Sequence, residues 1–126
     1  MSDEQLVSFK EMCARFDVTP RTLRYYEYIE LLSPHRDGRA RFYRPRDVAR
    51  MTLILRGRRF GFSLEEIRQW LMIYEEKGSR EQHEVWLALA DRQLKVLDDQ
   101  IADLQAARAD LESLRDRTAQ AVQDRD

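Results

Sequence analysis

The chain has 126 residues, of which 43% are hydrophobic and 36% are charged, with 4 glycines, 3 prolines and a formal net charge of −1. This composition suits one small folded head with a helical extension and predicts a mainly α-helical fold. No apolar run reaches the roughly 18 residues of a membrane span, and the polar start MSDEQLVSF is unlike a signal peptide, so we expect a cytoplasmic, nucleoid-associated protein. The single cysteine, Cys13, excludes an internal disulfide and a multi-thiolate metal site, and we predict neither a metal nor a cofactor.

The charges are distributed unevenly. Residues 1–61 hold 13 Lys and Arg against 8 Asp and Glu, whereas residues 62–126 hold 9 against 15. Within residues 21–61 there are 11 arginines, no lysine and 4 acids. Arginine presents a planar fork that suits phosphates and guanine edges. The pattern favours a phosphate-binding head over a solvated face whose charges are balanced.

Two short helices are predicted at the start of the head. Ser8 and Glu11 have the spacing of a capping box, and apolar residues at three- and four-residue steps then predict a buried face made by Phe9, Met12, Cys13 and Phe16. Thr19 is a suitable N-cap and Pro20 suits the first position of a second helix, which runs to about Ile29. Two short helices joined by about four residues are typical of a helix-turn-helix.

The second helix of that motif is the one that reads DNA. Leu23 and Tyr26 lie on one side and are assigned to the core, while the opposite side is basic and aromatic. The candidate DNA-binding residues of this helix are Thr19, Arg21, Thr22, Arg24, Tyr25 and Tyr28.

A β-hairpin is predicted after Leu31 and Leu32. Asp37-Gly38 is a strong signal for a tight turn in which both positions have positive φ. Period-two alternation then places Arg39, Arg41 and Tyr43 on one face of a short strand. A two-stranded ribbon is marginal alone, so it should pack on the helices as a wing, with these three residues contacting DNA.

Two more helices complete the predicted head. Pro45 begins the third, with Asp47 in its first turn, and Gly61 ends it. A second capping box, Ser63 to Glu66, begins the fourth. The apolar residues assigned to their buried faces are Val48, Met51, Ile54, Leu55, Ile67, Trp70, Leu71 and Tyr74.

The last predicted element is a long helix over residues 79–119, which follows a linker at 75–78 and precedes a frayed tail at 120–126. It contains neither glycine nor proline, and its apolar residues follow a heptad seam interrupted by Arg108. About 40 helical residues span roughly 60 Å, too far for the small head to cover, so we favour a coiled coil with a second copy over a helical hairpin. The predicted dimerisation residues are Leu87, Leu94, Leu97, Ile101, Leu104 and Leu111.

Several motifs together resemble the MerR family of bacterial regulators. They are Thr-Pro-Arg-Thr-Leu-Arg-Tyr-Tyr-Glu at 19–27, Ile-Glu-Leu-Leu at 29–32, Arg-x-Tyr at 41–43, Asp-Val at 47–48 and Gly-Phe-Ser-Leu-Glu-Glu-Ile at 61–67. The resemblance covers residues 8–76 in detail, and five elements occur in the expected order. It implies a winged helix-turn-helix head, an antiparallel coiled-coil homodimer, and a pseudo-palindromic promoter that is distorted so that RNA polymerase engages it.

The resemblance also assigns roles to single residues. Arg21 and Arg24 belong to the recognition helix, Tyr25 to a backbone contact and Arg41 to the wing, while Arg56 or Arg59 matches a second backbone anchor. The sequence departs from the family pattern in the wing, and Arg44 stands where a capping Ser is frequent. Neither the cysteines of metal-sensing members nor a ligand domain follows the long helix.

The sequence leaves the effector and the exact function open. A pocket for a small-molecule effector is a candidate at Phe62, Trp70, Tyr74 and Trp86, although aromatic residues at helical spacing are more often core. Alternative functions are an architectural, excisionase-like DNA-bending protein and a coiled-coil adaptor that does not bind DNA. An enzyme is not expected, since no nucleophile, base and metal set is assembled.

Overall fold

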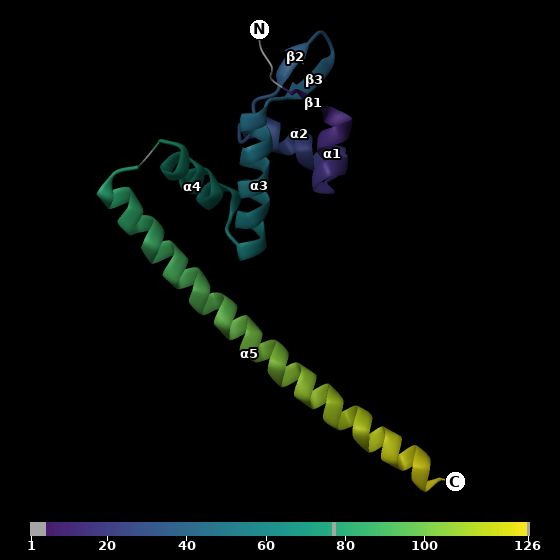
Figure 1. Ribbon diagram of the computed structural model, residues 1–126. Helices are drawn as coiled ribbons and strands as arrows, with labels where there is room; N and C mark the ends of the chain where they lie inside the picture. The colour runs from purple at the N-terminus through teal and green to yellow at the C-terminus, as the bar shows by residue number, and fades with distance from the viewer. Residues whose placement is uncertain (1–4, 77, 126) are drawn as a thin grey trace. The chain divides into compact units, whose positions relative to one another are not determined.

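The computed structural model describes residues 5–76 and 78–125. The chain forms two compact units that divide between His83 and Glu84. The first is a head of four helices and a small sheet, and the second consists of the rest of one long helix (Figure 1). The described residues therefore have the mainly α-helical composition that the sequence predicts.

The predicted helix-turn-helix is present as α1 (Phe9–Phe16) and α2 (Pro20–Tyr28). The Ser8 hydroxyl accepts the Glu11 N–H at 3.1 Å, and the Thr19 hydroxyl accepts the Thr22 N–H at 3.1 Å, so both helices begin with side-chain caps. Helix α1 ends at Asp17, whose left-handed backbone (φ 52°) turns the chain toward α2.

The wing has three strands rather than the predicted two. Strand β1 (Val7–Ser8) pairs with β3 (Ala40–Tyr43), which pairs with β2 (His35–Asp37), in the antiparallel order β1-β3-β2. The added strand ties the wing to the start of α1 by a single peptide link, so the hairpin does not rely on its own marginal stability. In Figure 1 the three strands lie together at one end of α1 and α2.

The hairpin turn lies one residue later than the sequence predicts. Asp37 pairs with Ala40, so the two turn residues are Gly38 and Arg39, and of these only Gly38 has positive φ (63°). A glycine at the first of two turn positions is typical of a type II′ turn. Arg39 therefore lies at the exposed tip of the wing rather than in the strand.

Tyr43 is fully buried, which corrects its prediction as a DNA contact. Arg41 and Tyr43 share a face of β3, as the alternation predicts, but that face is turned toward the helices. Both side chains reach Glu27 of α2. The alternation gives the period of a strand but not which of its faces is covered.

Helices α3 (Pro45–Phe60) and α4 (Leu64–Glu76) form a helical pair closed by Gly61, which has φ 92°. Arg44 provides no side-chain cap for α3, whereas Ser63 and Glu66 cap α4 reciprocally at 2.8 and 3.1 Å. The pair packs closely at Gly57, where an added Cβ would lie 2.7 Å from the Ile67 side chain.

The core of the head joins all these elements. Its fully buried large side chains come from α1, α2, the strands and both later helices, and Leu31 and Leu32 close it as predicted. The largest of them are Met12, Leu23, Leu31, Leu32, Tyr43, Met51, Ile54, Ile67 and Leu71.

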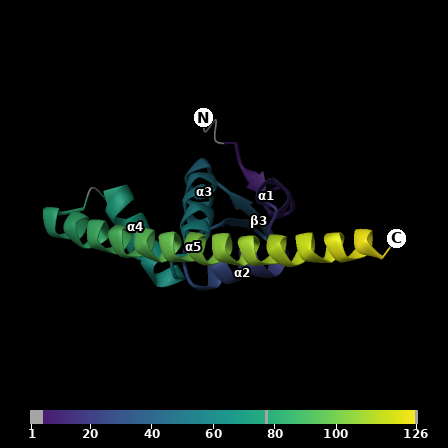
Figure 2. The same ribbon diagram turned by 90° about the horizontal axis from the view of Figure 1, so that it is seen from below.

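Helix α5 (Arg80–Asp124) is a continuous helix of 45 residues, which Figure 2 shows from below. Ser79 and Gln82 form the predicted capping box at its start, with bonds of 2.7 and 3.2 Å. The helix continues past Ala119 to Asp124, so most of the predicted tail is helical. Lys77 of the predicted linker and the final residue of the tail lie outside the described residues.

Gly57→Ala should destabilise the head. The methyl group would overlap Ile67, which is fully buried and has little room to move, so we expect a loss of about 1–3 kcal/mol in the free energy of unfolding. Thr52→Ala, at an exposed position of the same helix, is the control and should leave stability nearly unchanged. Urea titration followed by circular dichroism measures both. Equal stability of the two variants would contradict close packing at Gly57.

Asp47 should make the stability of the head depend on pH. Burial raises the pKa of its carboxyl, although the Ser33 N–H and the charge of Arg50 favour the ionised form. Because the folded pKa lies above the unfolded value of about 3.9, ionisation disfavours the folded state. The wild type should lose stability relative to Asp47→Asn as pH rises from about 3.9 to the folded pKa, and the difference should level off at higher pH. Thermal melts of both proteins between about pH 3.5 and 7 would measure it, and a relative gain would contradict it.

Candidate nucleic-acid interface

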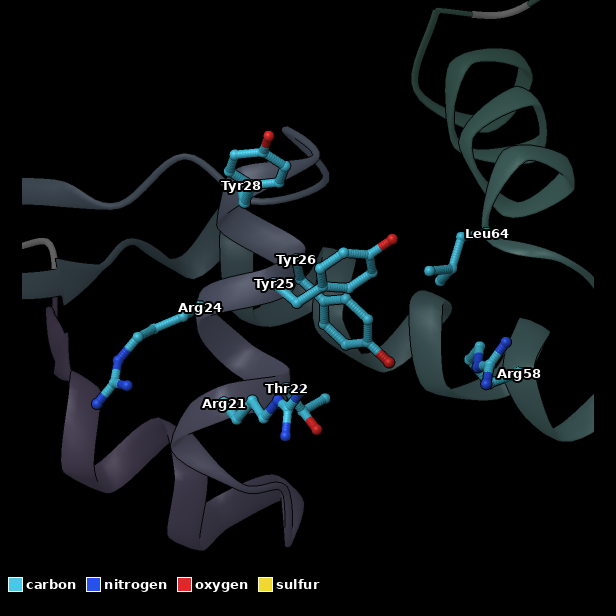
Figure 3. Close-up of a pocket in the computed structure, with 8 residues that line it drawn as sticks. All are labelled: Arg21, Thr22, Arg24, Tyr25, Tyr26, Tyr28, Arg58 and Leu64. Carbon is cyan, nitrogen blue, oxygen red and sulfur yellow. The ribbon is translucent and has the colours of Figure 1, made fainter.

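The outer face of α2 borders an open groove of about 650 Å³. Tyr25 and Tyr28 are 48% and 83% exposed, whereas Tyr26 is buried to 6%, so the predicted division between outer and core tyrosines is confirmed. Figure 3 shows the side chains of this groove projecting from α2 and from the opposite α3–α4 corner. The lining residues are Arg21, Thr22, Arg24, Tyr25, Tyr26, Tyr28, Arg58 and Leu64.

The two threonines of the recognition helix contact each other. The Thr19 hydroxyl accepts the Thr22 N–H and donates to the Thr22 hydroxyl at 2.9 Å. In the structure they cap the start of α2, the helix that carries Arg21 and Arg24. Their direct contact with DNA stays a prediction.

A second groove of about 450 Å³ lies between the start of α1 and the wing. Arg24 lines both grooves, so the recognition helix and the wing belong to one continuous basic surface. The residues of this second groove are Ser8, Phe9, Lys10, Arg24, Arg39, Ala40, Arg41 and Phe42. Four of these eight side chains are cationic and none is acidic, which suits a polyanion.

Glu27 joins the wing to the recognition helix beneath this surface. Its carboxylate, whose side chain is 8% exposed, lies 3.4 Å from the Arg41 guanidinium and accepts a hydrogen bond from the Tyr43 hydroxyl. Burial, and then the hydrogen bond to Glu27, raise the pKa of Tyr43, so the hydroxyl stays protonated and donates. These two contacts with Glu27 hold the wing against α2. Part of the Arg41 guanidinium is therefore engaged within the protein.

A similar link holds the other end of α2. Arg68 of α4 donates to the carbonyl of Ile29, just after the last residue of α2, and lies 3.5 Å from Glu65. A cation at the carboxyl end of a helix also complements the helix dipole. The sequence does not reveal this contact, because the two residues are 39 positions apart.

The basic residues at the end of α3 are placed differently from the prediction. Arg58 lines the α2 groove, while neither Arg56 nor Arg59 lines either groove. Arg56 lies over the Phe60 ring, 6.0 Å from its centroid. The α2 groove therefore favours Arg58 as the anchor in this part of the head. Contacts from Arg56 and Arg59 remain predictions.

The residues of the predicted effector pocket have different environments. Phe62 is 3% exposed and meets Phe60 edge-on at 5.9 Å, and Trp70 lies 6.3 Å from Phe60, so these rings belong to one aromatic cluster in the head. Tyr74 is 65% exposed. Trp86 belongs to the second unit. An effector pocket at these residues remains a prediction.

The predicted dimerisation seam is an apolar stripe along α5. Leu87, Leu94 and Ile101 are 52–58% exposed, and Leu104 and Leu111 are 70% and 67% exposed. Leu97 is half-buried. A stripe of this length on one helix is unusual for a surface that remains in water.

Comparisons with known proteins identify the family. Residues 7–72 match the family described as MerR HTH family regulatory protein, and residues 48–114 match the family described as MerR, DNA binding. The chain belongs to the MerR family. It is 38% identical over 105 residues to the HTH-type transcriptional regulator HmrR of Rhizobium leguminosarum bv. viciae, covering 82% of this chain and 80% of that one.

MerR-family structures have the same fold. A MerR-family transcriptional regulator from Bacillus cereus matches with a TM-score of 0.64 at 30% identity, over 81% of this chain and 76% of that chain. HiNmlR, a MerR-family regulator that lacks the sensor domain and was crystallised bound to promoter DNA, matches with a TM-score of 0.63 at 23% identity, over 80% and 76% of the two chains. The winged helix-turn-helix fold predicted from the sequence is confirmed.

Several residues of this surface are not predicted from the sequence. Lys10 precedes the predicted recognition helix, and Leu64 lies inside the predicted capping box of the fourth helix. Phe9 lines a groove, although the sequence predicts it in the core. For Arg58 the sequence contains a signal, because it lies between Arg56 and Arg59, the two predicted anchors. Only the packing of α3 against its neighbours decides which of Arg56, Arg58 and Arg59 lines the groove.

Arg58→Gln should weaken binding to duplex DNA and lower the salt dependence. Loss of one phosphate contact would reduce the slope of log affinity against log salt by about 0.9. Arg59→Gln is the matched control, since it removes the same charge from the next position, outside the groove. Fluorescence anisotropy at several salt concentrations measures both slopes. An equal or larger effect of Arg59→Gln would instead favour the anchor assigned from the sequence.

Proposed function

We propose that the protein is a DNA-binding transcription regulator that binds a pseudo-palindromic promoter as a homodimer and controls transcription by distorting it. One observation supports this most directly: arginines of the recognition helix and of the wing line grooves that share Arg24. Membership of the MerR family agrees with it. The head would bind DNA, and the long helix would pair two chains so that the dimer carries two heads.

Recognition divides between two kinds of contact. Arg21 and Arg24 leave the outer face of α2, the helix that enters the major groove in this motif, so we assign them to base edges. Tyr25, Tyr28, Arg39 and Arg58 are exposed around them and are assigned to phosphates, which set the register of the protein on DNA. Arg41 is half-buried and paired to Glu27, so it places the wing, and its remaining N–H groups are assigned to DNA.

Dimerisation follows from the apolar stripe on α5. Pairing with a second copy would remove Leu94, Ile101 and Leu104 from water. The head, which ends near residue 83, is too small to cover this stripe along the whole helix. A two-fold dimer presents two identical recognition helices, and its operator should therefore have two related half-sites. We infer an antiparallel pairing from the family resemblance.

Distortion of the promoter would follow from a fixed distance between the two heads. Smooth bending of a site of 20–30 base pairs costs on the order of 1–6 kcal/mol, which the phosphate contacts of two heads would offset. RNA polymerase would then be affected through the shape of the promoter. No helix among the described residues is long and apolar enough to cross a membrane, and we place the protein on the nucleoid in the cytoplasm.

The proposal is tested with the DNA upstream of the protein's own gene. We expect a gel shift with that duplex at a lower protein concentration than with a shuffled duplex, and a sedimentation coefficient of a dimer. Affinity should fall steeply with salt, by about 0.9 log units per phosphate contact for each log unit of salt. A double substitution in the stripe, Leu104→Asp with Leu111→Asp, should give a monomer with weak binding, whereas Asp103→Ala with Asp110→Ala should not.

The outcomes separate the alternatives. A dimer that ignores duplex DNA at low salt would favour the coiled-coil adaptor. Binding and bending without any change in transcription in vitro from an overlong promoter spacer would favour an architectural protein. A monomer would contradict the role given to α5.

A further inference from the structure

Phe9 lies beneath two arginines of the basic surface. It is the first residue of α1 and is half-buried. The guanidinium carbon of Arg24 lies 5.7 Å from the centroid of its ring, and that of Arg41 lies 5.4 Å from the same centroid. One ring therefore contacts a cation from the recognition helix and a cation from the wing, within the distance at which cation–π attraction acts.

Glu27 does not form an ion pair with Arg24, so it does not draw the Arg24 guanidinium away from the Phe9 ring. The two residues are three positions apart on α2, a spacing at which helical ion pairs form. The Glu27 carboxylate is instead occupied by Arg41 and Tyr43. Among the described residues Arg24 has no ion-pair partner, and Figure 3 shows its side chain extending from α2 toward α1, away from Leu64 and Arg58.

A guanidinium held over a ring keeps its N–H donors. They lie in the plane of the group and remain available to bond a guanine edge or a phosphate. A long arginine side chain loses rotamer entropy when it is fixed in one conformation. A contact that orders the side chain before binding reduces that cost in the complex.

We propose that Phe9 is a positioning residue for DNA recognition, whose ring orients Arg24 and Arg41 together and so couples the recognition helix to the wing. The proposal rests on the proposed function of the head. Phe9, Arg24 and Arg41 all line the groove between α1 and the wing, so the ring acts at the surface that would face DNA. Its effect on DNA passes through the arginines rather than through a contact of its own.

The test compares Phe9→Leu with Phe9→Tyr. Leucine keeps an apolar side chain but removes the ring, whereas tyrosine keeps the ring. The probes are a duplex selected from a randomised pool by the wild-type protein and a shuffled duplex of equal length. Phe9→Leu should bind the selected duplex about three- to tenfold more weakly, with a smaller loss on the shuffled duplex, while Phe9→Tyr should stay within about twofold of the wild type.

A double-mutant cycle separates positioning from a general structural role. If Phe9 acts through Arg24, then Phe9→Leu should add little to the loss caused by Arg24→Ala, since residues in contact give non-additive effects. Thermal melts of all four proteins provide the stability control. Fully additive losses, or equal losses for Phe9→Leu and Phe9→Tyr, would overturn the proposal.

A measurement without DNA keeps the proposal testable if Phe9→Leu folds poorly. In the NMR spectrum of the wild-type protein the Arg24 Nε–H signal should be displaced by the ring current of Phe9, and Phe9→Tyr should preserve the displacement. A signal at the position of a solvated arginine would overturn the proposal. A wild-type chain that binds neither duplex would contradict the proposed function, whereas wild-type binding that Phe9→Leu leaves unchanged would contradict only the role of Phe9.

Discussion

The buried carboxylate of Glu27 holds the parts of the head in register. It is on the inner face of the recognition helix, and it receives Arg41 and Tyr43 from the wing. A buried charge of this kind is costly unless it is paired, so the packing of the wing on the recognition helix depends on both partners of Glu27. Arg24 lies outside this ion pair, over the ring of Phe9.

The rest of the head supports that junction. The α3–α4 pair packs without a side chain at Gly57, which allows the close approach of Ile67. Arg68 on α4 then reaches the carbonyl at the end of α2. The recognition helix is thereby held at its first turn by the Thr19 cap, and in its last turn by Glu27 and by the bond from Arg68 to the Ile29 carbonyl. A rigid helix presents its arginines at a defined spacing, which base recognition requires.

The second unit is constrained differently. No described residue of α5 is fully buried, and most of its leucines are exposed, from Leu87 to Leu114. A helix of this kind gains little from its own chain and would gain most from an equal partner. The head would thus bind DNA through charge and hydrogen bonds, whereas the long helix would pair two chains through apolar burial. Both are needed for a dimer that reads two half-sites.

The sequence by itself determined which helices form and where they begin. Capping boxes at Ser63 and Ser79, Thr19 before Pro20, and Gly61 are local signals whose physics depends on a few neighbouring residues. It also determined the stripe of α5, because helical periodicity is regular. Only the tertiary structure decided that Tyr43 is buried, that Arg58 rather than Arg59 lines the groove, that a third strand joins the wing, and that Phe9 meets two arginines. Each depends on which surface a distant segment covers, and residue spacing along the chain does not contain that information.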